Sequence, residues 1–475
     1  MLNIRRIIFY LFTLIYCVLC PVLILYSFGY IFNPVKKQLS QTGLIHIETI
    51  PSGADIYLGR SHYKYKTPTS INNLLPGRYQ VNLRLKGHRL WSHEISIEEG
   101  KASVFNDIFI LPRKLSPKIL NPQSYYQNLI LLREPGNFIL KTSPQLKDLS
   151  IFYLENEEFR PLLKDYAMYS DFSVSDVYPQ TGSRQIIVFG GQLWDKKFFL
   201  INPENKEHII TDITKLFNGR PDEIVWNVEY RNNCFILYGD DINRLDLKEM
   251  SVYPQFIEGI RGFGSSDKWL YLLEEDGRIF KADFDEPQRR LLFKDLGTRK
   301  EIFNKSRFYK IQLLEEGVLL LFGEKGDLIT TVPPYEIAQN RVSGINFYKS
   351  GKRLLFWLKN IIGVADFAGQ SVKNSVSSGQ ITIQTVYKYG KNISQCFWVQ
   401  GGTHIIFRDR NQIFLLELML DGKHHLEYIV EVKNNTNVSY SDTTGNLYYL
   451  DRKGRIAKLN IVPAGTYSFY RDNLN

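Results

Sequence analysis

The longest uninterrupted apolar run in the sequence lies near its beginning. Residues 7–32 contain no charged side chain, and no later stretch combines such length with the absence of charge. A helix rises about 1.5 Å per residue, so a run of this size crosses the hydrocarbon core of a bilayer with some tilt. The pattern predicts one transmembrane helix at 7–32, held in membrane lipid, and a linker at 33–42.

Charges on the two sides of this run bear on its orientation. Arg5 and Arg6 precede it and Lys36 and Lys37 follow it, so the positive-inside rule alone gives a tie. The head of the chain, residues 1–6, is short, and we therefore expect it in the cytoplasm. The rest of the chain is then expected outside the cytoplasmic membrane, as the extracytoplasmic part of a single-pass protein.

A cleaved signal peptide is the alternative reading of the same run. Signal peptides have an apolar stretch of about 7–15 residues before a cleavage site between small side chains. Ser27-Phe28-Gly29 loosely fits such a site, but the apolar run is too long for that class. We therefore expect the segment to stay on the chain as a signal anchor.

Residues 43–112 follow a different pattern, in which short runs alternate apolar and polar side chains. This is the period of strands that bury one face. Turn residues separate the runs, and in Pro51-Ser52-Gly53 and Pro76-Gly77 we expect each glycine at a positive φ. The stretch 60–68 is expected to be a loop. The pattern predicts a small β-sandwich, with strands at 43–50, 54–59, 78–85, 90–97 and 103–111.

This block resembles the PEGA domain along its whole length. It departs from the family at Ser52, where the family has Glu, and in 60–68, which lacks the glycine that often precedes Thr-Pro. Both departures concern turns. The resemblance implies a non-catalytic module of prokaryotic envelope and surface proteins, commonly beside a membrane anchor, and it implies no ligand. The residues that carry it are Pro51-Ser52-Gly53-Ala54, Ile56-Tyr57, Thr67-Pro68, Pro76-Gly77, Tyr79, Val81 and Gly87-His88.

From 118 to 463 a strand–turn–strand pattern recurs, although the repeats share little sequence identity. It is plainest at 270–284 and 447–461. The first core residue of each second strand recurs about every 44 residues, within the range of a four-stranded propeller blade. The pattern predicts an all-β propeller of seven or eight blades. The recurring positions are Ile151, Phe198, Ile242, Ile279, Leu328, Ile362, Ile413 and Ile456.

The last repeat ends too early to supply its own outer strand. It stops at Val462-Pro463, just after its third strand, and residues 464–475 are read as a tail. We expect the missing strand from around 108–120, because a closed ring leaves no open edge. The repeats lack the signature of WD40 blades. In their architecture they resemble propellers that follow PEGA domains in bacterial envelope proteins.

Composition and charge narrow the function classes. Aromatic residues make up 14% of the chain and charged residues 23%, which fits a folded β protein. The net charge is +10, but part of it flanks the apolar run and the rest forms no basic block, so no nucleic-acid partner is expected. Cys234 and Cys396 each lie in an apolar, strand-like stretch, where we expect buried free thiols.

Few residues suggest chemistry. The paired carboxylates Glu274-Glu275-Asp276 and Asp240-Asp241 fall in predicted hairpin turns, where acidic residues are common turn formers. His424-His425 has no cysteine or carboxylate neighbour at the spacing of a metal site. We therefore predict no catalytic residue, no cofactor-binding residue, no cofactor and no metal ligand.

Aromatic clusters are the other candidates for binding, and we interpret them as core. His88, Trp91 and His93 are read as a turn histidine, a core tryptophan and a solvent-facing histidine. The remaining tryptophans lie in separate repeats, mostly within strands, and are expected to pack between blades; they are Trp194, Trp226, Trp269, Trp357 and Trp398.

These patterns predict a non-enzymatic, membrane-tethered binding or scaffold protein of a prokaryotic cell envelope. The propeller is its expected recognition platform, for a protein or an envelope glycan. The long loops 212–223, 297–306 and 368–381 are expected to carry the contacts. Two other classes stay open: an envelope glycan hydrolase or lyase on a propeller scaffold, and a subunit of a secretion or surface-layer assembly.

Overall fold

The structure is a computed structural model in which the chain divides into two compact units. Met1–Ser116, Glu417–His425 and Asn460–Asn475 belong to the first unit, and Pro117–Leu416 with Leu426–Leu459 forms the second. The structure describes residues 2–34, 37–131, 137–154, 156–162, 172–180, 185–192, 195–202, 209–227, 232–266, 269–283, 289–293, 303, 305–314, 318–338, 341–348, 352–367, 381–419 and 423–462.

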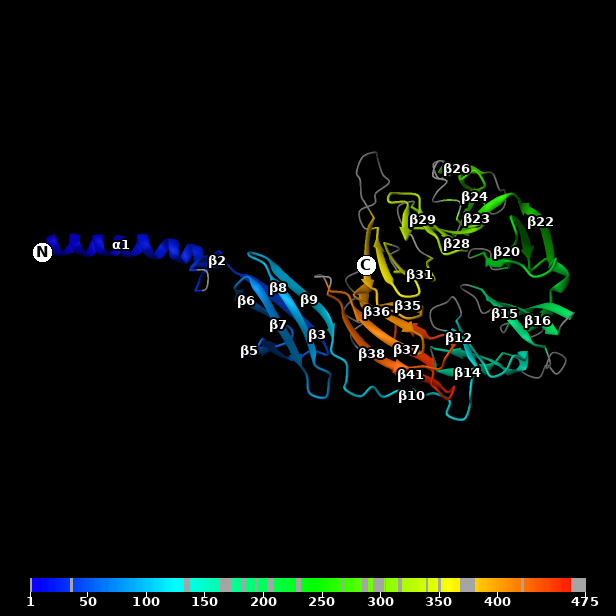
Figure 1. The fold of residues 1–475 in the computed structure, drawn as a ribbon, viewed down its shortest axis with the longest axis horizontal. Helices are drawn as coiled ribbons and strands as arrows, with labels where there is room; N and C mark the ends of the chain where they lie inside the picture. Colours follow the sequence, from blue (N-terminus) through cyan, green and yellow to red (C-terminus); the bar gives the residue numbers. More distant parts are fainter. Residues whose placement is uncertain are drawn as a thin grey trace. The chain divides into compact units, whose positions relative to one another are not determined.

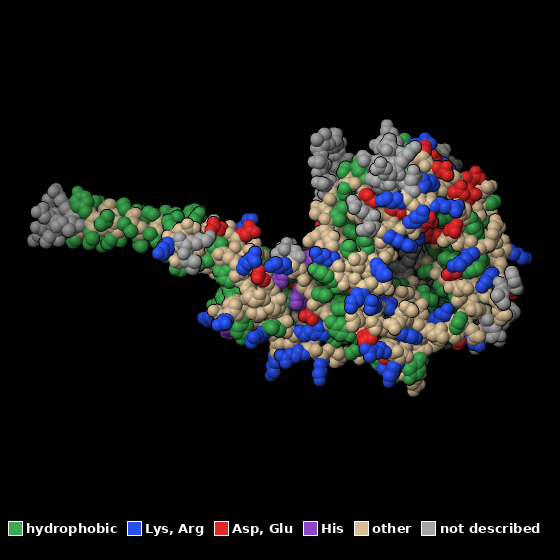
Figure 2. Space-filling view, in the orientation of Figure 1, with side chains coloured by type: hydrophobic (Ala, Val, Ile, Leu, Met, Phe, Trp, Pro, Cys, Tyr) green, Lys and Arg blue, Asp and Glu red, His purple; other side chains and the backbone are tan. Residues whose placement is uncertain are grey.

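The first unit begins with helix α1 (Leu2–Ser27). Its segment Ile8–Ser27 has a mean hydropathy of 2.6 and none of it is buried, so by length and composition it is able to cross a membrane. Figure 2 shows hydrophobic side chains covering it. The predicted end at residue 32 is wrong, because Gly29 adopts a φ of +78° that ends the helix. Arg5 and Arg6 lie in α1, but their side chains are outside the described part.

A short hairpin occupies most of the predicted linker 33–42. Its strands are β1 (Tyr30–Asn33) and β2 (Gln38–Gln41), which form a two-stranded sheet of their own. The sequence pattern missed it because four-residue strands are too short to display a period. Lys36, which lies between the strands, is outside the described residues.

Residues 43–112 fold as the predicted β-sandwich. One sheet has the strand order β6-β3-β9 and the other β5-β4-β7-β8. All five predicted strands are present. Two further strands were not predicted: β5 lies within the stretch expected to be a loop, and β6 follows that stretch directly. Strand β5 is almost wholly exposed, so it shows no alternation. The bounds are β3 (Gly43–Ile50), β4 (Asp55–Leu58), β5 (Ser61–Lys66), β6 (Thr69–Leu74), β7 (Gly77–Arg84), β8 (Trp91–Ile97) and β9 (Ala102–Phe109).

The two glycine turns of the sandwich differ. Gly53 has a φ of +89°, as predicted. The expectation for Gly77 is wrong: its φ is not positive, since it is the first residue of β7 and pairs with Ile97 of β8. Pro51-Ser52-Gly53 is therefore a turn, whereas Pro76-Gly77 leads into a strand.

The second unit is a β-propeller with eight four-stranded blades in its described residues (Figure 1). Blades four and five share one sheet, because the innermost strands β23 and β27 pair in parallel through Gly262↔Tyr309 and Phe263↔Lys310. The first four blades are β11 (Asn128–Leu131), β12 (Asn137–Lys141), β13 (Leu149–Tyr153) and β14 (Glu158–Pro161); β15 (Val174–Pro179), β16 (Ile186–Gln192), β17 (Asp195–Ile201) and β18 (Ile210–Asp212); β19 (Glu223–Trp226), β20 (Asn233–Tyr238), β21 (Asp241–Asp246) and β22 (Ser251–Ile257); β23 (Ile260–Ser265), β24 (Trp269–Glu274), β25 (Ile279–Asp283) and β26 (Arg290–Phe293).

Blades five to eight complete the ring. Short 3-10 helices lie at Leu146–Asp148, Thr214–Leu216 and Gln400–Gly402. The remaining strands are β27 (Tyr309–Leu313), β28 (Leu319–Gly323), β29 (Leu328–Thr330) and β30 (Glu336–Ala338); β31 (Gly344–Phe347), β32 (Arg353–Trp357), β33 (Ile362–Asp366) and β34 (Thr382–Tyr387); β35 (Ile393–Val399), β36 (His404–Asp409), β37 (Gln412–Glu417) and β38 (His425–Glu431); β39 (Ser439–Ser441), β40 (Asn446–Leu450), β41 (Ile456–Asn460) and β10 (Lys118–Ile119).

The repeat positions and the ring closure are both confirmed. Each of the eight recurring core residues lies in the third strand of a blade and is buried. In the last blade, strand β10 pairs with β41 through Lys118↔Lys458 and Ile119↔Ala457. The outer strand of the last blade thus comes from the start of the propeller, as predicted.

Apolar cores lie between successive blades. Phe198 of the second blade packs in one cluster with Trp226 and Cys234 of the third. Cys234 and Cys396 are buried free thiols, as expected. Trp226, Trp357 and Trp398 are buried, so their interpretation as packing residues is confirmed, and Trp269 is partly buried. Trp194 lies outside the described residues.

Candidate ligand-binding site

The propeller encloses a cavity of about 510 Å³ among its innermost strands. Residues of β19, β23 and β27 supply most of the wall, and Ile345 of β31 adds to it. The innermost strands of a propeller surround its axis, and we therefore call this space, which lies along blades three to six, the axial cavity. Concave sites with mostly apolar walls and a few polar groups are the usual places for ligand binding.

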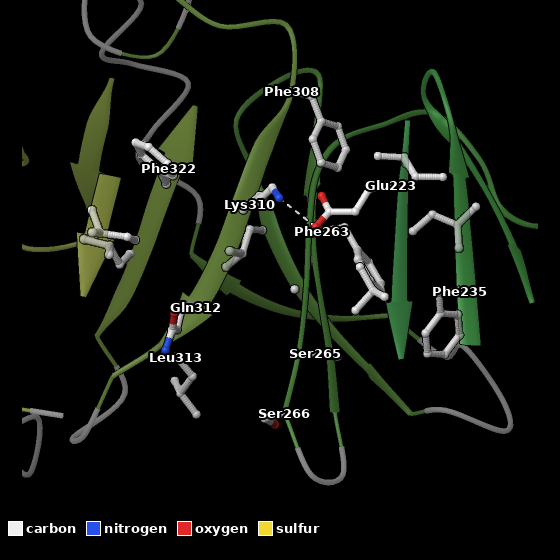
Figure 3. Close-up of a pocket in the computed structure, with 17 residues that line it drawn as sticks. Glu223, Phe235, Phe263, Ser265, Ser266, Phe308, Lys310, Gln312, Leu313 and Phe322 are labelled. Atoms are coloured by element: carbon white, nitrogen blue, oxygen red, sulfur yellow. Dashed lines mark hydrogen bonds and ion pairs between the residues drawn. The ribbon is translucent and has the colours of Figure 1, made fainter. Parts of the chain in front are cut away.

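One end of the axial cavity carries an ion pair. Lys310 Nζ on β27 lies 2.7 Å from Glu223 Oε1 on β19, although one blade separates these strands in the sequence (Figure 3). The Glu223 side chain is 18% exposed and the Lys310 side chain 59% exposed. The pair therefore places one carboxylate and one ammonium, partly open to solvent, at the mouth of the cavity.

Glycine on the strand between them permits this approach. A Cβ at Gly264 of β23 would lie 1.9 Å from the carbonyl oxygen of Ile311, and one at Gly262 would lie 2.9 Å from that of Tyr309. Only a residue without a side chain fits at Gly264. The parallel pairing of β23 with β27 depends on it, and that pairing brings Lys310 toward Glu223.

The rest of the lining is largely apolar. Four phenylalanines contribute rings, and Figure 3 shows them around the space beside β23 and β27. Toward the other end lie the hydroxyls of Ser265 and Ser266 and the amide of Gln312. The aromatic rings are Phe235, Phe263, Phe308 and Phe322. Such a wall accommodates an apolar group, and its polar ends are able to orient a hydrogen-bonding one.

The lining also bears on the glycosidase alternative. Glycoside hydrolysis uses two carboxyl groups about 5–9 Å apart. Among the described residues of the cavity wall, Glu223 is the single carboxylate, and it is already paired with Lys310. The cavity therefore offers groups for binding and lacks, in its described lining, the pair that this chemistry requires.

The acidic clusters singled out from the sequence lie away from the cavity, in hairpin turns. Glu274 ends β24 and forms ion pairs with Arg278, at 3.0 Å, and Arg289, at 2.6 Å. Asp276 Oδ1 accepts the backbone N–H of Arg278 at 3.0 Å and so stabilises the same turn. Asp240 lies in the turn between β20 and β21, and Asp241 is the first residue of β21. The interpretation as turn residues is confirmed for Glu275, Asp276 and Asp240, whereas Glu274 and Asp241 are the strand residues that flank these turns.

The histidine candidates belong to the first unit. His424 Nδ1 accepts the backbone N–H of Met419 at 3.0 Å, and the described residues contain no cluster of metal-ligand type. Trp91 is buried in the core of the sandwich, so its interpretation as a core residue is confirmed. The prediction of a solvent-facing His93 is wrong: it is 8% exposed, since it lies two residues after Trp91 on the same face of β8.

The sequence analysis missed the cavity residues. Of the three loops expected to make contacts, 212–223 reaches the site through Glu223. Most of 297–306 and all of 368–381 except Ile381 lie outside the described residues. The available signal was Gly262-Phe263-Gly264 within a strand-like stretch, because glycines inside a strand mark the close approach of another backbone.

Three comparisons relate the chain to known proteins. Residues 42–107 match the PEGA domain family. No curated protein matches the sequence. Among solved structures, the propeller domain of Cps50 (Swd1) from Myceliophteria thermophila is 12% identical and has a TM-score of 0.38; the alignment covers 73% of this chain and 99% of that one.

Two further structures are similar at the same level. The computationally designed protein Ika8 is 10% identical, with a TM-score of 0.43 and coverage of 71% of this chain and 96% of that one. PorZ of Porphyromonas gingivalis, described as an essential bacterial surface component of the type-IX secretion system, is 11% identical with a TM-score of 0.38. That alignment covers 70% of this chain and 42% of PorZ.

Proposed function

We propose that this chain, which carries a PEGA domain at residues 42–107 between an apolar helix and a β-propeller, is a membrane-tethered binding protein of a prokaryotic cell envelope. The axial cavity is the recognition site in this proposal. It receives an apolar group of a protein or an envelope glycan, and the partner is bound without being chemically changed.

The composition of the cavity carries the proposal. Its wall is apolar for most of its length and polar at both ends, which suits a group that is held and oriented. The PEGA domain supports an envelope location, because the family resemblance implies envelope and surface proteins. The helix Ile8–Ser27 supports tethering, with the short head in the cytoplasm and the propeller outside.

The cavity is tested by filling it. Ser265→Trp places an indole in the space that the partner is proposed to use, and Ser251→Trp in the outer strand β22 is the matched control. The full-length, affinity-tagged protein is cross-linked in its native membrane, and its partners are identified by mass spectrometry. We expect the Ser265→Trp variant to lose a partner that the wild type and the Ser251→Trp variant retain.

Two outcomes contradict the proposal. Equal recovery of every partner by the two tryptophan variants, with unchanged melting temperatures, shows that the axial cavity is not the recognition site. Turnover of a cell-wall glycan by the purified protein, abolished by Glu223→Gln, shows that the site is an enzyme and not a binding platform.

Topology is tested separately. Protease added to spheroplasts should digest the bulk of the chain while leaving a membrane-embedded fragment that contains α1. Protection of the propeller from the protease, or release of a mature form beginning near Gly29, contradicts the proposed anchoring.

A further inference from the structure

The β1–β2 hairpin is fixed directly to the end of helix α1. Both the backbone N–H and the hydroxyl of Thr42 donate to the carbonyl oxygen of Gly29 at 2.8 Å. Gln41 Nε2 donates to the carbonyl oxygen of Phe28 at 3.3 Å. Strands of this length extend about 13 Å. The whole hairpin therefore lies within that distance of the point where the helix ends.

One face of the hairpin exposes two apolar side chains, and the other face buries two polar ones. Phe32 and Leu39 are directly paired across the strands, which places them on one face, and they are 61% and 54% exposed. On the opposite face Asn33 and Ser40 are 5% and 2% exposed. This is the reverse of a hairpin that faces water, since a soluble surface normally leaves polar residues outside.

The residues at the end of helix α1 also expose apolar side chains. Phe28, the residue between α1 and Gly29, is 67% exposed, and Tyr26 in the last turn is 61% exposed. Lys37 stands exposed at the turn of the hairpin. Aromatic rings are enriched at the level of lipid headgroups, and lysine beside them pairs with lipid phosphate.

We propose that the hairpin lies in the interfacial layer of the membrane, with Phe32 and Leu39 inserted among the lipids and Lys37 at the phosphates. This inference rests on the proposed membrane tethering by α1. The occupant of the apolar face is lipid, because the face continues the apolar surface of the helix and carries a positive charge at its rim. The hairpin thereby fixes the depth of the helix and the orientation of the chain that leaves it.

Photo-cross-linking of the full chain tests the inference. Benzoyl-phenylalanine, which keeps an aromatic ring at Phe32, is placed at Phe32 or at Leu39. The matched control places it at Gln38, which is exposed on the other face of the hairpin. The protein is reconstituted in vesicles of phosphatidylethanolamine and phosphatidylglycerol and irradiated. Mass spectrometry should detect lipid adducts at Phe32 and Leu39 at several-fold the yield found at Gln38.

A probe at Phe12, within α1 and 66% exposed, separates this inference from the tethering itself. Lipid adducts at Phe12 together with the background yield at Phe32 and Leu39 overturn the inference and leave the tether standing. Absence of adducts at Phe12 as well overturns both. Adducts between Phe32 and a second protein chain in place of lipid also overturn the inference, because they identify a protein–protein contact.

Discussion

The sandwich of residues 43–112 and the propeller are both built from β-strands, but their strands are buried differently. In strand β8 of the sandwich, buried side chains alternate along Trp91–Ile97 with side chains that are partly or fully exposed. In strand β20 of the propeller, five consecutive residues are buried, from Asn233 to Leu237. A sandwich strand has one face on the core and one face on water, whereas a middle strand of a blade packs against neighbouring blades on both faces.

This difference decides what each domain tolerates. On a sandwich strand every second position is free to vary, because its side chain faces water. On a middle strand of a blade successive positions are all committed to packing, so variation is displaced to the loops and the innermost strands. A binding site in the propeller is therefore expected at the axis or the rim, because side chains there are not required for packing between blades.

The largest expected effects come from adjacent positions of β20. Phe235 and Ile236 are 2% and 0% exposed and point to opposite faces of the blade. Phe235→Ala should lower the free energy of unfolding of the propeller by about 3–5 kcal/mol and Ile236→Ala by about 2–5 kcal/mol. Chemical denaturation of the full chain measures both. An unchanged free energy of unfolding at either position would contradict the burial of β20 on both faces, because that face would then behave like one exposed to solvent.

A matched pair in the sandwich should behave asymmetrically. Ile95→Ala removes a side chain that is 1% exposed and should cost about 2–5 kcal/mol in the unfolding of the first unit. Ser96→Ala, at the exposed neighbouring position, should change that value by less than about 0.5 kcal/mol. Denaturation curves that resolve the two units provide the measurement. Comparable losses from both substitutions would contradict the one-sided burial of β8.

Glycine substitutions extend the comparison to the backbone. Gly264→Ala should destabilise the propeller by about 1–3 kcal/mol, because the added carbon meets the carbonyl oxygen of Ile311. Gly77→Ala in the sandwich should be tolerated to within about 0.5 kcal/mol, since the nearest atom to its Cβ is 4.0 Å away and its φ is not positive. Thermal melting of the two variants tests this, and equal melting temperatures would remove the steric argument for the cavity wall.

The smallest expected effect is a pH dependence confined to the propeller. Glu157 pairs with Lys458 of β41 and with Lys118 of β10, and the hydrogen bond from Lys458 lowers the pKa of its carboxyl group. A lowered pKa in the folded state contributes stability above the ordinary value of 4.5 that is lost as the pH falls through the folded value. The carboxylate is partly exposed, so the loss should be below about 1 kcal/mol.

Glu157→Gln provides the control for this dependence. It should remove the contribution of the Glu157 carboxylate to the free energy of unfolding at neutral pH, so the stability of the propeller should fall less steeply as the pH is lowered. The pH dependence of unfolding of the sandwich should not change. Unfolding measured in steps between neutral pH and pH about 3 reports the difference. An unchanged slope in the variant would show that this carboxylate does not stabilise the ring closure.

The two modes of burial also explain what the sequence predicted. The sandwich strands were found by alternation, as at Trp91–Ile97, and β5 was missed because exposure on both faces erases the period. In the propeller, continuous burial hides the individual strands, but the turns between second and third strands recur. Their spacing predicted the third-strand positions and the closing strand, because each blade needs the same length of chain.

The axial site was harder to predict for a physical reason. Glu223 and Lys310 come together through the parallel pairing of innermost strands from different blades, and no local pattern records which blades meet. His93 shows the opposite case: we predicted that it faces solvent, although its position two residues after Trp91 on the same strand already indicated burial. Local periodicity determines which face a side chain takes, whereas the meeting of distant strands is a property of the closed ring.

The closing strand has a mechanical consequence. In the proposed membrane-tethered arrangement, strand β10 is the first part of the propeller that a pull on α1 reaches along the chain, and its pairing with β41 joins the two residues Lys118 and Ile119. A further bond follows at Leu120, whose N–H donates to Ile456 O at 3.0 Å. If α1 is held while a bound partner pulls on the propeller, the hydrogen bonds between β10 and β41 bear the tension along the chain before those of the other strands do. The ring is then expected to open at its last blade under load, which makes the closure a force-sensitive joint.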